Sequence, residues 1–186
     1  MSKEIHRLGG SALVSYMRMT DEALAELSRG LSERNLEVSL VLCHSGEREA
    51  DRARAMWPGA RVETHGVDFA HIQSADASIL EGLTADVLAQ VLPIAERSIG
   101  LHRDVNVSHL IQAVASQHRR ARDLIRRTNP TLGVFVAMPE RLLDFFVHKV
   151  LTESGIPCRY PRTGPLRGQT VFRSRAKRLC LQATRS

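Results

Sequence analysis

The stretch that decides the fold is TNPTLGVFVAMPERLLDFFVHKVLTESGIPCRY, residues 128–160. Residues 131–137 form a nearly continuous apolar run, which is typical of a strand covered on both faces in a parallel sheet. Pro139 suits the first turn of a following helix, and Gly155 suits its C-terminal cap. The apolar residues between them recur at helical spacing, namely Leu142, Leu143, Phe146, Val147, Val150 and Leu151. We therefore predict a strand–loop–helix–strand unit, with its loop at the carboxyl end of a parallel strand, where open α/β sheets bind ligands.

The rest of the chain alternates between strand and helix patterns. Further strands are predicted at 12–16, 38–43, 61–64, near 156 and near 170, and helices at 20–35, 46–56, 78–94 and 106–127. This alternation predicts one doubly wound, Rossmann-like α/β domain over residues 1–174, with helices on both faces of a mainly parallel sheet of five or six strands. Because crossovers stay right-handed, we expect the strand order 3-2-1-4-5. The polar segment 65–77 and the residues beyond Ser174 are expected to be poorly tethered.

Composition excludes several classes of protein. Aromatic residues make up 4% of the 186 residues, which argues against a stacking platform for single-stranded nucleic acid. No apolar run reaches the roughly 18 residues that span a bilayer, and the start, MSKEIHRLGGS, lacks a signal-peptide core. We therefore expect a cytoplasmic protein without a transmembrane segment. Cys43, Cys158 and Cys180 include no CxxC pair, so we expect reduced thiols, and we predict no metal and no cofactor.

The net charge of +6 comes from the last part of the chain. No acid follows Glu153, whereas eight of the 26 basic residues do, which leaves 18 basic against 20 acidic residues upstream. Residues 175–186 are expected to form a flexible basic tail. Such a tail is either simply solvated or contacts an anionic partner or a membrane surface peripherally.

A resemblance to a known family rests on FVAMPERLLDFFVHKVLTESGIPCRY (135–160) and the following PLRGQTVF (165–172). These segments, with Asn129-Pro130 before them and the opening LVSYMRMTDEALAELSRGLSERNLEVSLVLCH (13–44), resemble the amino-terminal half of bacterial capsular or surface polysaccharide biosynthesis proteins. Those proteins are glycosyltransferase-like, of the GT-B type with two facing Rossmann-type domains. Where the family often has Pro-His, this chain has Pro139-Glu140.

The resemblance implies an acceptor-side domain that takes part in polysaccharide biosynthesis. A sugar nucleotide, a glycan acceptor and a second Rossmann domain or second copy would be its partners. The chain ends about where the second domain of such a protein would begin, so we expect little or no turnover by this domain alone.

The candidate site residues follow the predicted strand ends. The candidate catalytic residues are His44 and Glu140, and the candidate ligand-binding residues are Met138, Pro139, Asp144, Arg167 and Arg173. We expect Glu140 and Asp144 on one helix face, where they would act as a base or orient an acceptor hydroxyl, or simply offset the helix dipole. Arg167 lies between Gly164 and Gly168, in a basic loop that would meet a phosphate or form a plain turn.

A different class of function also fits the sequence. The chain would then be a non-catalytic Rossmann-like binding module whose basic tail contacts an anionic partner. The presence of a second Rossmann half, in the same polypeptide or in a partner, discriminates between the two hypotheses.

Overall fold

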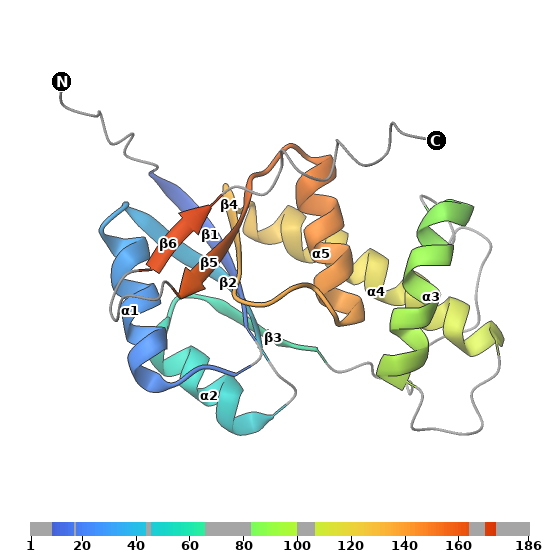
Figure 1. Cartoon of the computed structure of the whole chain (residues 1–186), viewed down its shortest axis with the longest axis horizontal. Helices are drawn as coiled ribbons and strands as arrows, with labels where there is room; N and C mark the ends of the chain where they lie inside the picture. Colours follow the sequence, from blue (N-terminus) through green and yellow to red (C-terminus); the bar gives the residue numbers. More distant parts are fainter. Residues whose placement is uncertain are drawn as a thin grey trace.

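The computed structural model describes residues 9–16, 18–43, 46–65, 83–99, 107–163 and 170–173. Within these ranges, six strands form one sheet in the order β3-β2-β1-β4-β5-β6 (Figure 1). They are β1 (Gly10–Ser15), β2 (Leu36–Cys43), β3 (Arg61–Thr64), β4 (Leu132–Phe135), β5 (Cys158–Thr163) and β6 (Thr170–Arg173). The first five are parallel neighbours in the order 3-2-1-4-5, and β6 pairs with β5 in the antiparallel direction. The predicted Rossmann-like α/β class and strand order are confirmed.

Helices cover both faces of the sheet. One face packs on α1 (Asp21–Ser32) and α2 (Glu47–Met56), through a core that includes Val14 and Val41. The other face packs on α4 (Val107–Thr128) and α5 (Leu142–Glu153), with Leu13 and Leu42 in that core. The helix α3 (Ala85–Ile99) packs on α4 and α5 and lies to the side of the sheet (Figure 1). The alternation of β1 side chains between the two cores follows from the two-residue period of a strand.

Three junctions from helix to strand depend on a left-handed residue. Asn35 (φ 54°) follows α1, Asn129 (φ 42°) follows α4, and Gly155 (φ 72°) follows α5. Asn and Gly tolerate this conformation better than other residues do. At Gly155 the N–H donates to the Thr152 carbonyl at 3.1 Å, and the Ile156 N–H donates to the Leu151 carbonyl at 2.8 Å. This pair of bonds is a Schellman motif, so the predicted cap at Gly155 is confirmed.

Two predicted helix boundaries are wrong. Residues 83 and 84 are not helical, and α3 begins at Ala85, where the Thr84 hydroxyl accepts from the Val87 N–H at 3.4 Å. The helix then continues through Pro93, whose side chain is exposed, to Ile99. Because Pro93 lies on the exposed side, water can bond the carbonyl that proline leaves without a partner. The predicted capping box of Ser78 and Glu81 lies outside the described residues.

The helix α5 also begins later than predicted, at Leu142. Its N-cap is Arg141, which has an extended backbone (φ −100°, ψ 150°). Pro139 and Glu140 are therefore in the loop between β4 and α5. The buried stripe of the helix starts only at Leu142, so residues 139–141 have no apolar face to bury and gain little from a helical turn.

Candidate functional site at the switch point

The strand order reverses between β1 and β4. From β1 the chain passes to α1 on one face of the sheet, and from β4 it passes to α5 on the other. Ser15 and Phe135 are register partners, so the two strands end level with each other. The two loops that follow, at residues 16–20 and 136–141, thus diverge from one point. In open α/β sheets, ligands bind in the crevice at such a switch point.

A buried hydrogen bond crosses the switch point. The Ser15 hydroxyl, at the end of β1, donates to Asp144 Oδ1 in the first turn of α5 at 2.6 Å. Ser15 is 4% exposed and Asp144 is 3% exposed. A hydrogen bond to a charged acceptor is stronger than one between neutral groups, and this one fixes the start of α5 against the central strand.

The second carboxylate oxygen of Asp144 faces a histidine from a third element. His65, directly after β3, has its Nδ1 3.4 Å from Asp144 Oδ2 and is only 7% exposed. Its backbone N–H donates to the Cys43 carbonyl at 3.2 Å, which continues the pairing of β3 with β2. The prediction that His65 begins a poorly tethered polar loop is therefore wrong, because ladder pairing and burial fix it. Residues 66–77 lie outside the described part of the chain.

The environment of Asp144 tunes its proton affinity. Burial raises the pKa of Asp144 to about 6, although the Ser15 hydrogen bond and the Arg141 charge each lower it. Removing a carboxylate from water disfavours its charged form. A carboxyl group with such a pKa can take up or release a proton near neutral pH, as a general base or acid must.

The loop between β4 and α5 holds three of the seven predicted site residues, and Asp144 follows in α5. Met138 is 52% exposed, Pro139 is half-buried and Glu140 is exposed. The prediction that Glu140 and Asp144 share a helix face is wrong, because Glu140 precedes α5 and only Asp144 is buried. Arg173 lies in β6, where its backbone pairs with Tyr160, but its side chain is not described. His44 and Arg167 lie outside the described residues.

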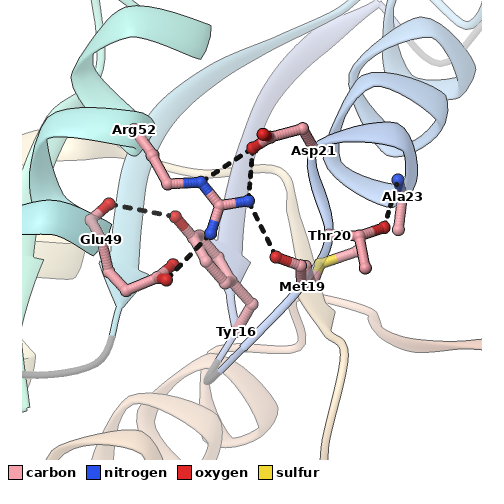
Figure 2. Close-up of polar contacts among 7 residues, drawn as sticks. All are labelled: Tyr16, Met19, Thr20, Asp21, Ala23, Glu49 and Arg52. Carbon is pink, nitrogen blue, oxygen red and sulfur yellow. Dashed lines mark hydrogen bonds and ion pairs between the residues drawn. The ribbon is translucent and has the colours of Figure 1, made fainter.

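On the other side of the switch point, α2 contacts the loop that follows β1 (Figure 2). The hydroxyl of Tyr16 donates to the Glu49 carbonyl at 3.3 Å. Burial, followed by the nearby Cys43 and Glu49, raises the pKa of Tyr16 to about 12. Tyr16 is therefore a neutral donor at physiological pH and serves as an anchor of this loop.

Thiol and metal chemistry find little support in the described residues. Burial raises the pKa of Cys43 and of Cys158 to about 11 each, so both thiols stay protonated at neutral pH. Both are free, as predicted for these two, whereas Cys180 lies outside the described residues. In the ranges that the structure describes, no group of three His, Cys, Asp or Glu side chains is placed to bind a metal ion. None of the described helices is both long and apolar enough to cross a membrane.

Sequence reasoning missed two members of this site, Ser15 and His65. Ser15 is the polar residue that ends the run ALVS. A polar residue at the end of a buried strand is a usable indication of a functional position. His65 directly follows a short edge strand and has no apolar neighbours in sequence that mark it as buried.

Comparison with known proteins found no matching family model, no matching curated protein and no matching solved structure. The fold and the site therefore define the structural class of the protein. The chain is a Rossmann-like α/β protein with a buried Ser15–Asp144–His65 cluster at its switch point.

Proposed function

We propose that this chain is the acceptor-side domain of a glycosyltransferase-like protein of surface polysaccharide biosynthesis. The observation that carries the proposal is the Asp144 carboxyl group, buried between Ser15 and His65 where β1 and β4 diverge. Glycosyl transfer needs a group that takes the proton of the acceptor hydroxyl, and a carboxyl group with a raised pKa suits that step. The resemblance of residues 135–160 to the family supports the same conclusion.

In this proposal, Asp144 is the base. The acceptor hydroxyl takes the place of the Ser15 hydroxyl on Oδ1, and His65 stays beside Oδ2. The acceptor oxygen bonds to the anomeric carbon as the bond from that carbon to the diphosphate breaks, and the acceptor proton passes to Asp144. The departing diphosphate needs cations or backbone donors around it. A facing Rossmann half, in this polypeptide or a partner, supplies them together with Arg167 and Arg173, and the protein works in the bacterial cytoplasm.

The test compares Asp144→Asn with Glu140→Gln, a matched change of an exposed carboxylate in the preceding loop. Sugar-nucleotide binding and glycosyl transfer are measured with the chain alone and with a lysate of the source cells, which supplies the facing half, the membranes and their glycan acceptors. We expect Asp144→Asn to slow transfer by roughly 100-fold or more and to leave donor binding unchanged, because a positioned base contributes about that factor. Equal transfer by both variants would contradict the role of Asp144. Rapid transfer by the unassisted chain would contradict the need for a second half.

A specific observation also favours the binding-module alternative. Both carboxylate oxygens of Asp144 already face protein groups, and all three side chains of the cluster are almost inaccessible to solvent. The cluster would then be structural, and the basic residues near the end of the chain would carry the function. Sedimentation with anionic phosphatidylserine vesicles tests this, with Lys177→Glu and Arg178→Glu as the charge-reversing changes. Salt-sensitive binding by the wild type, abolished by reversal, together with no sugar-nucleotide binding would favour the module.

A further inference from the structure

The outer side of α4 carries a row of arginines. Arg119, Arg122 and Arg126 follow one another at spacings of three and four residues, so they lie on one face of the helix, and all three are exposed. We call these three residues the arginine row; it spans roughly 10 Å along the helix axis. Residues 119–128 contain five arginines and one acid, Asp123, which pairs with Arg126 at 2.8 Å. This end of α4 therefore has an excess of positive charge.

Interactions within the protein explain only part of this charge. Cations in the last turn of a helix are stabilised by the helix dipole, which explains Arg126 and its neighbour Arg127. Arg119 and Arg122 lie before that turn, and within the described ranges their side chains form no hydrogen bond or ion pair. Like charges three and four residues apart destabilise a helix. These two arginines therefore oppose the stability of α4 without a compensating contact in the part of the chain that the structure describes.

The positive charge is concentrated on the α4 side of the molecule. Burial lowers the pKa of His118, and the charges of Arg122 and of Lys149 on α5 lower it further, against the opposing charge of Glu153. The helices on the opposite face of the sheet differ, because α1 and α2 together carry six acids and four arginines. Such a separation of charge turns the α4 side toward an anionic partner.

The arginine row begins beside the candidate site. Arg120, adjacent to Arg119, donates to the Thr64 carbonyl at 3.5 Å, directly before His65 of the buried cluster. From there α4 continues toward the start of β4, so the row runs from the carboxyl edge of the sheet toward its amino edge. A long ligand with one end at the switch point can therefore lie along α4.

The composition of this surface favours one kind of anionic partner. Every exposed residue of α4 is polar, namely Ser108, His109, Ser116, Arg127 and the arginine row. A membrane-surface helix buries an apolar face, and a protein interface is centred on large apolar or aromatic anchors, and the exposed side of α4 offers neither. With 4% aromatic residues, the chain is also poor in stacking residues for single-stranded nucleic acid. Arginine binds a carboxylate through two parallel hydrogen bonds, so a chain with repeated carboxylates fits the row.

We propose that the arginine row binds the acceptor glycan, and that this glycan is acidic: a polysaccharide whose sugars carry carboxylate groups. The inference rests on the proposed function, because it names the substrate class of the acceptor. The transfer chemistry stays with Asp144 at the switch point, while the row holds the chain beyond it. Each exposed ion pair contributes little alone, so affinity depends on the number of carboxylates that are engaged together.

The experiment measures binding of the full chain to polygalacturonate, to neutral dextran of the same length, to duplex DNA of the same charge and to phosphatidylserine vesicles. One variant changes all three residues of the arginine row to glutamate. The matched control has the same change in net charge at three exposed positions of α1 and α2, Arg29→Glu, Arg48→Glu and Arg54→Glu. We expect the wild type to bind polygalacturonate and not dextran. Reversal of the row should weaken that binding by about tenfold or more, and the control by less than about twofold, because salt screens distant charges.

Thermal unfolding checks that both triple variants fold, and if reversal of the row lowers Tm, the same three changes to glutamine take its place. Equal losses of binding in both triple variants would show that only net charge matters, and would overturn the proposal. Binding of duplex DNA or of the vesicles as tightly as polygalacturonate would overturn it too, since the row would then recognise any anionic surface.

Two further outcomes separate this inference from the proposed function. A wild type that does not bind polygalacturonate, but transfers sugar to a neutral acceptor with help from Asp144, would overturn the inference and leave the proposed function standing. Normal binding of polygalacturonate, with Asp144→Asn transferring as fast as the wild type, would instead overturn the proposed function and leave the arginine row as a glycan-binding surface.

Discussion

The Ser15 hydroxyl and the Asp144 carboxylate, 129 positions apart in the chain, are joined by a buried hydrogen bond of 2.6 Å. This bond connects the end of the central strand to the first turn of a helix on the far side of the switch point. It therefore makes the proton affinity of one carboxyl group depend on the packing of two distant segments. Stability and site chemistry are linked at this residue.

The first prediction concerns the pH dependence of stability. The pKa of Asp144 lies at about 6 in the folded protein and near its ordinary 3.8 in the unfolded chain. Because the folded pKa is the higher one, the contribution of the protonated group is fully present below pH 3.8 and is lost as the pH rises through about 6. We expect the free energy of unfolding of Asp144→Asn to rise by up to about 3 kcal/mol relative to that of the wild type as the pH increases from 4 to 7. Urea unfolding across this range measures that difference.

Ser15→Ala is the control for this assignment. The Ser15 hydrogen bond lowers the pKa of Asp144, so removing it should move the loss of stability to higher pH. If the difference in free energy of unfolding between Asp144→Asn and the wild type stays constant from pH 4 to pH 7, the carboxyl group does not titrate in this range.

The second prediction compares two neighbouring arginines of α4. Arg120 bonds to Glu63 of β3 and to the Thr64 carbonyl at 3.5 Å, whereas Arg119 is exposed. Burial raises the pKa of Glu63, but the bonds from Arg120 and Arg61 outweigh it and leave the pKa below its ordinary value. We expect Arg120→Ala to cost about 1–2 kcal/mol at pH 7, with the loss shrinking as acid protonates Glu63. Arg119→Ala should change the free energy of unfolding by less than about 0.5 kcal/mol. Denaturant titrations at pH 7 and pH 3.5 test both, and equal losses would refute the pairing.

A third prediction compares two glycines, one in the left-handed conformation after a helix and one inside a helix. Gly155 has a φ of 72° in the Schellman motif after α5, whereas Gly30 lies inside α1 with only Arg34 Nη1 near its missing side chain, at 3.7 Å. We expect Gly155→Ala to destabilise the protein by about 1 kcal/mol and Gly30→Ala to stabilise it by roughly 0.5–1 kcal/mol. Thermal unfolding of the two variants should therefore shift in opposite directions. A shift of the same sign in both would count against this assignment of backbone conformation.

The fourth prediction concerns close packing at Gly133 in β4. A methyl group there would lie 2.8 Å from Leu151 Cδ1 and 3.2 Å from Cys158 Sγ. Because these neighbours belong to α5 and β5, we expect Gly133→Ala to cost about 1–3 kcal/mol through overpacking. Gly59→Ala is the control, since its nearest atom would be Glu37 Oε1 at 4.0 Å. Equal denaturation midpoints for the two variants would show that the contact between α5 and the sheet can relax freely.

The fold was predictable because its evidence is local. The apolar run 131–137, the helical spacing after Leu142 and the glycine at 155 each determine a neighbouring conformation, and the handedness of crossovers then sets the strand order. Helix starts were less predictable. Pro139 and Ser78 both suggest a first turn, but α5 and α3 begin only where an apolar face can be buried, at Leu142 and Ala85.

The site was only partly predictable, because its key contacts join distant segments. Asp144 and the loop at Met138 were found from their place after a strand. Ser15 and His65 were not predicted, because their roles depend on the carboxylate of Asp144, and only the fold brings it beside their hydroxyl and imidazole groups. Glu140 was chosen because it lies in the loop after a strand and four residues before Asp144, and its exposure outside the helix could not be derived from spacing alone.

The pairing of β1 with β4 has a consequence for synthesis of the chain on the ribosome. Ser11 of β1 exchanges hydrogen bonds with Thr131, which is made 120 residues later. At roughly 5–20 residues per second, that interval lasts about 6–24 seconds. During this interval, the edge of β1 that will pair with β4 has no partner strand, although Ala12, Leu13 and Val14 are apolar. We therefore expect chaperones to capture a nascent chain that is stalled before Leu132.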